Sequence, residues 1–167
     1  MNQDSQITDK YSTWFKSPIG IIVITGTEDS VVSVNFADEE SESPHVSDVL
    51  LQCKKELEEY FSGKRKEFSV KTEPEGTDFQ KSVWAELCKV KYGDTASYID
   101  VANKLKNPGA VRAVGLANGR NPVAIIIPCH RIIGENGKLT GYAGGLWRKQ
   151  WLLEHEGNIS GKNPTLF

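Results

Sequence analysis

The sequence has few of the residues that hold small extracellular or metal-dependent proteins together. It contains only three cysteines and three histidines among 167 residues, and no two cysteines stand at Cys-x-x-Cys spacing. Disulfide scaffolds and zinc fingers both need clusters of these residues, so both classes are disfavoured. We therefore expect free thiols in a reducing compartment, no metal site and no cofactor.

Long apolar runs are also missing. No stretch approaches the ~20 residues that are needed to cross a bilayer. The first residues, Met1 to Gln6, are polar and lack the charged and apolar regions of a signal peptide. These absences predict a soluble protein without a membrane partner, located in the cytoplasm or with the nucleoid or nucleus. The length and apolar content suffice for one compact unit or two small lobes.

Charge is distributed unevenly along the chain. The formal net charge of -2 does not suggest a partner with many phosphates. However, residues 1–78 carry 8 Lys and Arg against 16 Asp and Glu, whereas residues 79–167 carry 12 against 6. An acidic half joined to a basic half indicates that only the second half meets a polyanion.

The most informative stretch is the apolar run from Asn121 to Pro128, which is followed directly by Cys129, His130 and Arg131. The density of isoleucine predicts a buried segment. Pro128 fixes its own φ and stiffens the chain just before the thiol. A thiol becomes a good nucleophile as a thiolate, and an adjacent imidazole can take its proton. Cys129 is therefore the candidate nucleophile, although many free cysteines are simply small core residues.

The other two cysteines provide an internal comparison. Cys53 recurs at helical spacing with the apolar residues of its segment, and Cys88 lies at the end of a similar stripe. Both are expected to be structural. Cys129 is the one cysteine that fits no helical face.

The N-terminal half has the pattern of a small α/β unit. Alternating and β-branched residues from Tyr11 to Phe36 predict a hairpin with its turn at residues 26–30. A helix is expected from about Ser47 to Ser62, ending at Gly63. A further strand is expected at Phe68–Val70, and residues 72–76 have the composition of a linker. No catalytic pattern is present in this half.

The C-terminal half is expected to be mainly helical. Asp78 is the expected N-cap of a helix that reaches about Lys89. Ser97 is expected to cap a short helix over Tyr98–Leu105, and after a turn at residues 106–109 a second short helix runs to about Asn118. Two short helices joined by a turn that contains glycine indicate a helix-turn-helix.

Two further elements follow the cysteine segment. Glycines on both sides of Tyr142 predict a loop that brings the backbone close to a ligand. A last helix is expected from about Leu146 to Glu156, with an irregular tail at residues 158–167. Carboxylates near a helix C-terminus are disfavoured by the helix dipole. A hydrogen bond to His130 would account for Glu156, whereas Glu154 is expected to be exposed.

These segments resemble the O6-alkylguanine-DNA alkyltransferase family. The resemblance rests on Pro-Cys-His-Arg at residues 128–131, on Arg112 to Gly115, on Gly141 to Gly145 and on Trp151 to Gly157. It implies an N-terminal ribonuclease-H-like α/β domain over residues 1–76. It also implies a mainly helical, winged helix-turn-helix-like domain over residues 77–167 for DNA binding and alkyl transfer.

The resemblance implies DNA repair by direct reversal. The alkyl group of O6-alkylguanine, and of O4-alkylthymine, would pass irreversibly to Cys129 after the nucleotide has been flipped out of double-stranded DNA. The protein would be a single-turnover methyltransferase, a monomer without an obligate protein partner or cofactor. His130, through a water, and Glu156 would assist deprotonation of the thiol. Tyr98 would donate a hydrogen bond or a proton to the base, and Asn121 would brace the recognition helix against the cysteine segment.

The family pattern also implies binding residues. Arg112 would intercalate into the gap left by the flipped nucleotide, and small residues of the same helix would allow close approach to the minor groove. The expected DNA-binding residues are Arg112, Ala113, Gly115, Ala117 and Arg120. The expected pocket residues are Tyr142, Ala143, Gly144 and Lys149. The chain departs from the pattern at Ala143, where a serine is common, and at Ala124, where a proline is common.

Three other functions fit part of the pattern. A sensor of alkylated DNA that performs no transfer would share the DNA-binding residues, but such relatives lack the cysteine. A winged helix-turn-helix regulator would not need a thiol, an imidazole and a downstream carboxylate. A cysteine phosphatase needs Cys-x5-Arg, whereas Arg131 follows Cys129 by two positions.

Overall fold

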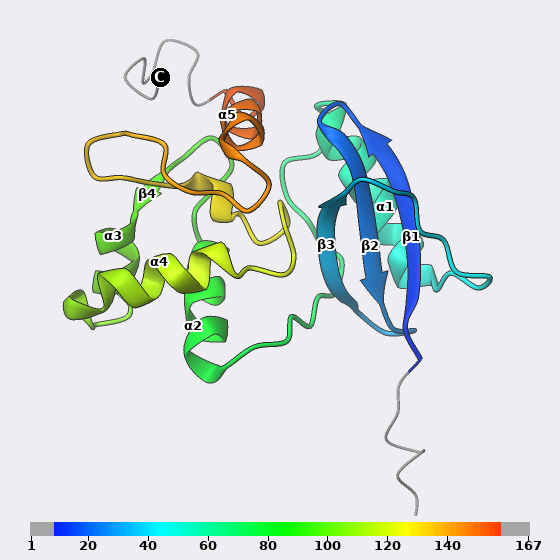
Figure 1. The fold of residues 1–167 in the computed structure, drawn as a ribbon, viewed down its shortest axis with the longest axis horizontal. Coiled ribbons are helices and arrows are strands. Elements are labelled where there is room, and N and C mark those ends of the chain that lie inside the picture. Colours follow the sequence, from blue (N-terminus) through cyan, green and yellow to red (C-terminus); the bar gives the residue numbers. More distant parts are fainter. Residues whose placement is uncertain (1–8, 158–167) are drawn as a thin grey trace, which may run out of the picture. The chain divides into compact units, whose positions relative to one another are not determined.

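The computed structural model describes residues 9–157, and the chain forms two compact units, Met1–Pro74 and Glu75–Phe167 (Figure 1). The expected irregular tail lies outside the described residues. Within residues 9–157, no helix is both long enough and apolar enough to cross a bilayer.

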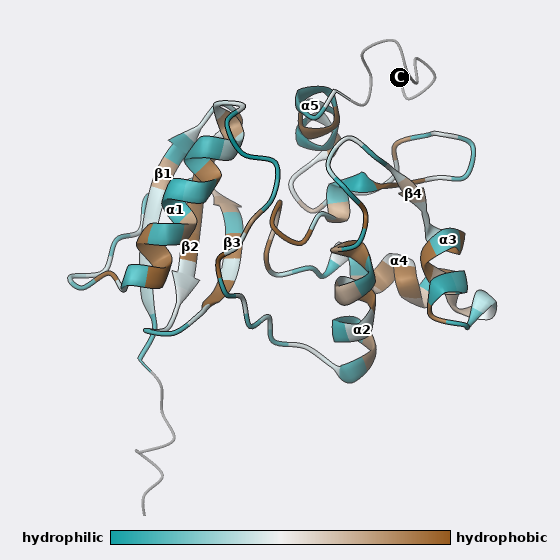
Figure 2. Ribbon diagram, turned by 180° about the vertical axis from the view of Figure 1, so that it is seen from behind, coloured by the Kyte–Doolittle hydropathy of each residue, from teal (hydrophilic) through white to brown (hydrophobic). Residues whose placement is uncertain are grey.

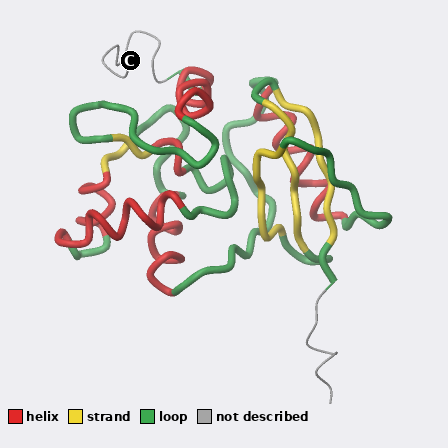
Figure 3. Tube along the Cα trace, viewed as in Figure 1, coloured by secondary structure: helices red, strands yellow, loops and turns green. Residues whose placement is uncertain are grey.

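The N-terminal unit contains a three-stranded antiparallel sheet in the order β1-β2-β3 (Figure 3). The strands are β1 (Tyr11–Ser17), β2 (Gly20–Gly26) and β3 (Val31–Ala37). The β pattern was therefore correct, but it contained three strands rather than one hairpin. Residues 18–19 form the first connection, and the expected turn at residues 26–30 forms the second, with a register shift at Thr25/Gly26.

One helix, α1 (Asp48–Phe61), packs against all three strands of this sheet. The apolar colouring in Figure 2 follows β2 and one side of α1. Leu50, Cys53, Leu57 and Tyr60 are completely buried, at helical spacing. Cys53 is therefore a core residue, as its position in the stripe predicted.

The strand expected at Phe68–Val70 is not formed. The backbone N–H groups of Ser69 and Val70 donate instead to the buried carboxylate of Glu56, at 3.0 and 3.2 Å. Because these donors are already satisfied by a side chain, the segment does not pair over those residues. In the described part of the chain, the segment joins the sheet through an isolated parallel bridge between Val31 and Thr72.

The C-terminal unit is mainly helical, as expected. Its helices are α2 (Asp78–Leu87), α3 (Tyr98–Lys104), α4 (Val111–Gly119) and α5 (Leu146–His155), with short 3-10 turns η2 (Pro108–Ala110) and η3 (Cys129–Arg131). Two short strands, β4 (Ala96–Ser97) and β5 (Ile132–Ile133), pair in parallel. Helices α2, α3 and α4 pack on one another, and the indole of Trp84 donates to the carbonyl of Ala117 at 2.9 Å.

Capping decides where two of these helices begin. Ser97 caps α3 as expected, and it shares a capping box with Asp100. For α2 the expected cap was wrong by one position. Thr77 is the N-cap, because its hydroxyl accepts from the N–H of Gln80 while the Gln80 side chain accepts from the N–H of Thr77.

The expectation for Cys88 was also wrong. Helix α2 ends at Leu87, so Cys88 occupies the C-cap and is exposed rather than part of the apolar stripe. The periodic pattern did extend to Cys88, but the helix stops one residue earlier.

Candidate active site

The cysteine segment is a tight turn and not an extended strand. The N–H of Ile127 donates to the carbonyl of Val123 at 3.0 Å, and Ile125 has a φ of 73°. A positive φ is unusual for a β-branched residue and stores strain that the surrounding packing must hold. Val123, Ile125 and Ile127 are buried, so the prediction of a buried segment is confirmed.

Asn121 closes this turn with its side chain. Its Nδ2 donates to the carbonyl of Ile127 at 2.7 Å, and its Oδ1 accepts from the N–H of Val123 at 2.9 Å. One amide therefore fixes both ends of the turn. This turn then fixes the position of Pro128, the residue before η3.

Cys129 begins η3 and is 6% exposed. Burial raises the pKa of its thiol, although a hydrogen bond from Asn121 and the positive charge of Lys149 act in the opposite direction. The resting residue is thus a neutral thiol. Its proton must leave as part of any reaction in which the sulfur is the nucleophile.

The residues after Cys129 surround one buried carboxylate. His130 Nε2 lies 2.7 Å from Glu156 Oε2, so the contact expected between these two side chains is present. Arg131 donates from Nε to Glu156 Oε1 at 2.8 Å and from Nη2 to Oε2 at 3.0 Å. Its Nη1 donates to the carbonyl of Val90 at 2.7 Å. The three ionisable side chains form the Glu156 cluster, which joins η3 to the C-cap of α5.

The protonation states in this cluster follow from burial and charge. Burial by itself would raise the pKa of Glu156, but His130 and Arg131 hold it well below its usual range. Burial lowers the pKa of His130, despite the neighbouring carboxylate. A neutral imidazole that donates Nε2–H to Glu156 presents the lone pair of Nδ1. Nδ1 has no hydrogen-bond partner among residues 9–157, so it is available as a proton acceptor.

Sequence reasoning did not assign a role to Arg131. Its buried guanidinium neutralises Glu156, which a histidine of lowered pKa cannot do alone. The sequence signal was a charged residue placed three positions after a segment expected to be buried. Its partner, 25 positions away, could be found only in the folded chain.

Lys149 is fully buried in α5 and is bonded to backbone carbonyls. Its Nζ donates to Ile132 at 2.6 Å and to Thr140 at 2.7 Å, with Gly141 at 3.5 Å. Burial lowers the pKa of Lys149 to about 8, a shift that the thiolate form of Cys129 would partly oppose. Lys149 thus holds the loop between β5 and α5 in place and supplies positive charge near the thiol.

The remaining expected pocket residues lie in the same loop. Burial raises the pKa of Tyr142, and the thiolate form of Cys129 would raise it further, so the phenol stays protonated. Ala143 is exposed, and the carbonyl of Gly144 accepts from Arg148 Nη1 at 3.0 Å. The structure therefore brings Tyr142 and Lys149 into the electrostatic environment of Cys129.

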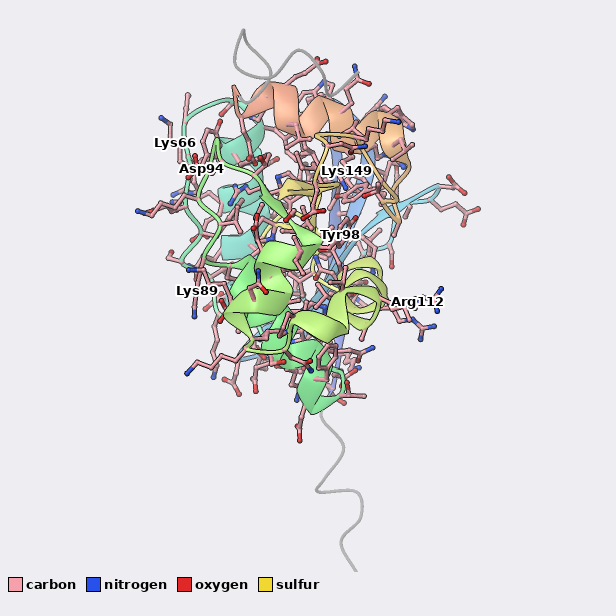
Figure 4. All side chains as sticks on the ribbon, turned by 90° about the vertical axis from the view of Figure 1, so that its left-hand side faces the viewer. Lys66, Lys89, Asp94, Tyr98, Arg112 and Lys149 are labelled. Carbon is pink, nitrogen blue, oxygen red and sulfur yellow. The ribbon has the colours of Figure 1, made fainter. Side chains whose placement is uncertain are left out.

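Tyr98 is the first residue of α3, and its hydroxyl lies 2.6 Å from the hydroxyl of Thr140. Figure 4 marks Tyr98 and Lys149, the residues whose bonds meet at Thr140. Thr140 is a second residue to which sequence reasoning gave no role.

Helix α4 presents part of the expected DNA-binding set to solvent. Arg112, Ala113 and Arg120 are exposed, and Figure 4 shows the Arg112 side chain extending away from the helix. Leu116 is 63% exposed on the same face and was not anticipated. An arginine that projects from a helix-turn-helix is suited to contact with nucleic acid.

Two of the expected residues of α4 face elsewhere. Ala117 is 2% exposed and lies against Trp84, so it cannot provide close approach to a ligand. Gly115 faces α3, because a Cβ at that position would lie 3.8 Å from the Tyr98 ring. Both follow from the packing of α4 on its neighbours, which small residues permit.

The C-terminal unit thus combines a helix-turn-helix with a buried thiol, an imidazole and a carboxylate, which defines a class of DNA-associated proteins with a cysteine nucleophile. Two family models match the chain. The model described as "6-O-methylguanine DNA methyltransferase, ribonuclease-like domain" matches residues 10–74. The model described as "6-O-methylguanine DNA methyltransferase, DNA binding domain" matches residues 78–158. The chain belongs to the 6-O-methylguanine DNA methyltransferase family.

Individual relatives agree with this assignment. The chain is 49% identical over 154 residues to the methylated-DNA–protein-cysteine methyltransferase of Methanosarcina acetivorans, covering 89% of this chain and 99% of the relative. The crystal structure of Mycobacterium tuberculosis O6-methylguanine methyltransferase matches with a TM-score of 0.80 and 41% identity, over 89% of this chain and 93% of that one. The crystal structure of Mycobacterium tuberculosis OGT in complex with DNA matches with a TM-score of 0.79 and 44% identity, over 87% of this chain and 91% of that one. The expected fold class, an α/β unit followed by a mainly helical unit, is therefore confirmed.

Proposed function

We propose that this chain repairs alkylated DNA by direct reversal, through transfer of the alkyl group from O6-alkylguanine to Cys129. The observation that carries the proposal is the Glu156 cluster beside a stiffly held thiol, in a unit that also presents Arg112 on an exposed helix. The proposed substrate is double-stranded DNA, with O4-alkylthymine as a second lesion. The acting species is a monomer that needs no cofactor or obligate protein partner and works where the DNA is, in the cytoplasm, nucleoid or nucleus.

DNA binding uses the exposed face of α4. An alkyl group on guanine O6 cannot be reached inside the duplex, so the nucleotide must be extruded, which costs a few kcal/mol. Arg112 enters the gap and compensates part of the lost stacking. Ala113 allows close approach of the helix, and Arg120 binds the phosphate backbone. Residues 77–167 perform this step and the chemistry, and residues 1–76 contribute no catalytic residue to the proposal.

The chemical step is an in-line displacement at the alkyl carbon. The Cys129 proton passes through a water to His130 Nδ1, because no direct hydrogen bond joins the two side chains among the described residues. Glu156 stabilises the imidazolium that forms. The sulfur–carbon bond forms while the carbon–O6 bond breaks, and the electron pair remains on the purine. Tyr98 donates a hydrogen bond or a proton to the purine and so improves the leaving group.

The surrounding residues hold the geometry of this step. Asn121 fixes the turn that carries Cys129, and the loop of Tyr142, Ala143 and Gly144 walls the base. Lys149 adds positive charge, which favours the thiolate. The product is a thioether, which no nearby side chain can cleave. Each molecule should therefore act once.

Mass spectrometry tests the proposal. The protein is incubated with one equivalent of duplex oligonucleotide containing O6-methylguanine and then digested. We expect a gain of one methylene on the peptide that contains Cys129, and no gain in Cys129→Ala. Cys53→Ala is the matched control and should still be methylated. An unmodified wild-type protein that binds the lesion would favour a sensor, and one that neither binds nor reacts would refute the proposal.

A further inference from the structure

Thr140 lies in the loop between β5 and α5 and connects two residues of the proposed active site. Its hydroxyl is 2.6 Å from the phenol oxygen of Tyr98, which is 42 positions away in the sequence. Its carbonyl accepts a hydrogen bond from Lys149 Nζ at 2.7 Å. The side chain of Thr140 therefore contacts Tyr98, the proposed donor to the base. The backbone of Thr140 contacts Lys149, a buried cation.

The backbone of Tyr98 is fixed independently of Thr140. Tyr98 follows the N-cap Ser97, whose hydroxyl accepts from the N–H of Asp100 at 3.1 Å, while the Asp100 carboxylate accepts from the N–H of Ser97 at 2.9 Å. One side of the ring faces Gly115 of α4. The direction of the phenol O–H depends on its hydrogen-bond partner, which is Thr140 within residues 9–157.

The position of Thr140 is in turn tied to the core of the C-terminal unit. Lys149, which holds its carbonyl, is completely buried and also donates to Ile132 of β5 at 2.6 Å. The Thr140 backbone is therefore anchored between β5 and α5, although its side chain is exposed. An exposed hydroxyl on an anchored backbone is well placed to orient a partner.

We infer that Thr140 is a positioning residue for Tyr98, an inference that rests on the proposed alkyl transfer. In the free protein either hydroxyl can be the donor. When the extruded base offers an acceptor, Tyr98 turns its proton toward the base and Thr140 donates to the phenol oxygen. If the phenolic proton then moves to the purine that carries the electron pair, the same Thr140 donor stabilises the phenolate that remains.

Single-turnover kinetics with an O6-methylguanine duplex tests this inference. We expect Thr140→Val, which keeps the shape but lacks the hydroxyl, to lower the rate constant at saturating protein about tenfold. Affinity for the same duplex, measured by equilibrium binding with Cys129→Ala in the background, should not change. Thr140→Ser restores the hydroxyl and should return the rate to within about threefold of wild type.

A double-mutant cycle separates positioning from a merely structural role. In the Tyr98→Phe background, Thr140→Val should have no further effect, because the phenol that it orients is absent. Equal slowing in both backgrounds, or a wild-type rate for Thr140→Val, would overturn the inference. So would a wild-type rate for Tyr98→Phe. In each of these cases Cys129 of the wild-type protein still becomes methylated. If the proposed function itself fails, the wild-type protein is not methylated at all.

Discussion

Within residues 9–157, the N-terminal and C-terminal units each bury one glutamate, and the partners of the two carboxylates differ. Glu56 of α1 accepts from backbone N–H groups, the Ser69 hydroxyl at 2.7 Å and the Gln52 amide at 2.9 Å. Glu156 accepts from His130 and Arg131. Neutral donors can only fix a loop, whereas ionisable donors allow a proton to be taken up and its charge to be shared.

The electrostatic outcome is similar although the causes are not. Burial alone would raise the pKa of both carboxyls, and both pKa values are nevertheless lowered. For Glu56 the hydrogen bonds from neutral groups are responsible. For Glu156 the positive charge of the Arg131 guanidinium adds to the hydrogen bonds from His130 and Arg131. The two carboxylates therefore differ in whether a partner can exchange a proton, because His130 can and the donors to Glu56 cannot.

The largest test replaces each carboxylate by an amide. Glu156→Gln removes the charge that stabilises the His130 imidazolium, and we expect the single-turnover rate of alkyl transfer to fall about 100-fold. Breaking this buried cluster should also lower the free energy of unfolding by about 3 kcal/mol. Glu56→Gln should lower stability by about 1–3 kcal/mol while leaving the transfer rate of the folded protein unchanged. Single-turnover rates and denaturant titrations of the two variants measure these effects. The comparison would be contradicted if Glu56→Gln slowed transfer as much as Glu156→Gln.

A second test compares two arginines that bind glutamate. Arg131→Lys cannot reproduce the paired hydrogen bonds to Glu156, and we expect transfer to slow about tenfold and stability to fall by about 2 kcal/mol. The matched change is Arg65→Lys, because Arg65 Nε binds the partly exposed Glu59 at 2.9 Å. That change should alter stability by less than about 1 kcal/mol and leave transfer intact. If the two variants behaved alike in kinetics and chemical denaturation, the buried position of Arg131 would have no special role.

Acid should destabilise the C-terminal unit before the N-terminal one. The pKa of His130 is lowered by burial, so below about pH 6.5 the unfolded chain binds a proton that the folded chain refuses. Stability therefore falls with decreasing pH in that range, by up to about 1.4 kcal/mol per pH unit.

Glu56 and Glu156 have lowered pKa values, and their contributions are lost only below about pH 4.5. Calorimetry from pH 7.5 to 5 should show the slope in the wild type. A flatter slope is expected in His130→Asn, and an equal slope in both proteins would contradict this assignment.

The smallest expected effect concerns two helix ends with the same hydrogen bonds. After α1, Lys64 N–H donates to Glu59 and Gly63 N–H to Tyr60; after α3, Asn107 N–H donates to Ala102 and Lys106 N–H to Asn103. At both helix ends the residue after the C-cap has a left-handed backbone conformation, with φ of 80° at Gly63 and 60° at Lys106. Glycine is favoured there because it has no Cβ.

Exchange of these residues should therefore change stability in opposite directions. We expect Lys106→Gly to raise the free energy of unfolding by about 0.5–1 kcal/mol and Gly63→Lys to lower it by about 1 kcal/mol. A Cβ at Gly63 would meet no atom within 4 Å, so the second effect tests the backbone alone. Thermal unfolding measures both, and a stabilising Gly63→Lys would contradict the argument.

Local patterns predicted the elements well where the information lies within a few residues. Ser97 caps α3 because its partner Asp100 is three positions away, and the stripe that contains Cys53 repeats within one helix. The pattern failed where a local rule was overridden. Cys88 continued an apolar period beyond the end of α2, and Phe68–Val70 had strand-forming residues whose N–H groups bind Glu56 instead.

The residues that make up the candidate site could be recognised from the sequence, because Cys129, His130 and Arg131 are adjacent and Pro128 stiffens the chain before them. The helix dipole disfavours a carboxylate at the C-terminal end of a helix. The position of Glu156 therefore indicated that it has a specific partner. Three features are visible only in the folded chain: Arg131 binds Glu156 together with His130, Thr140 contacts Tyr98, and Ala117 faces inward. These contacts join residues that are far apart in the chain or depend on which helix face is covered. The packing of side chains, rather than local backbone preference, determines both the long-range contacts and the helix face that is covered.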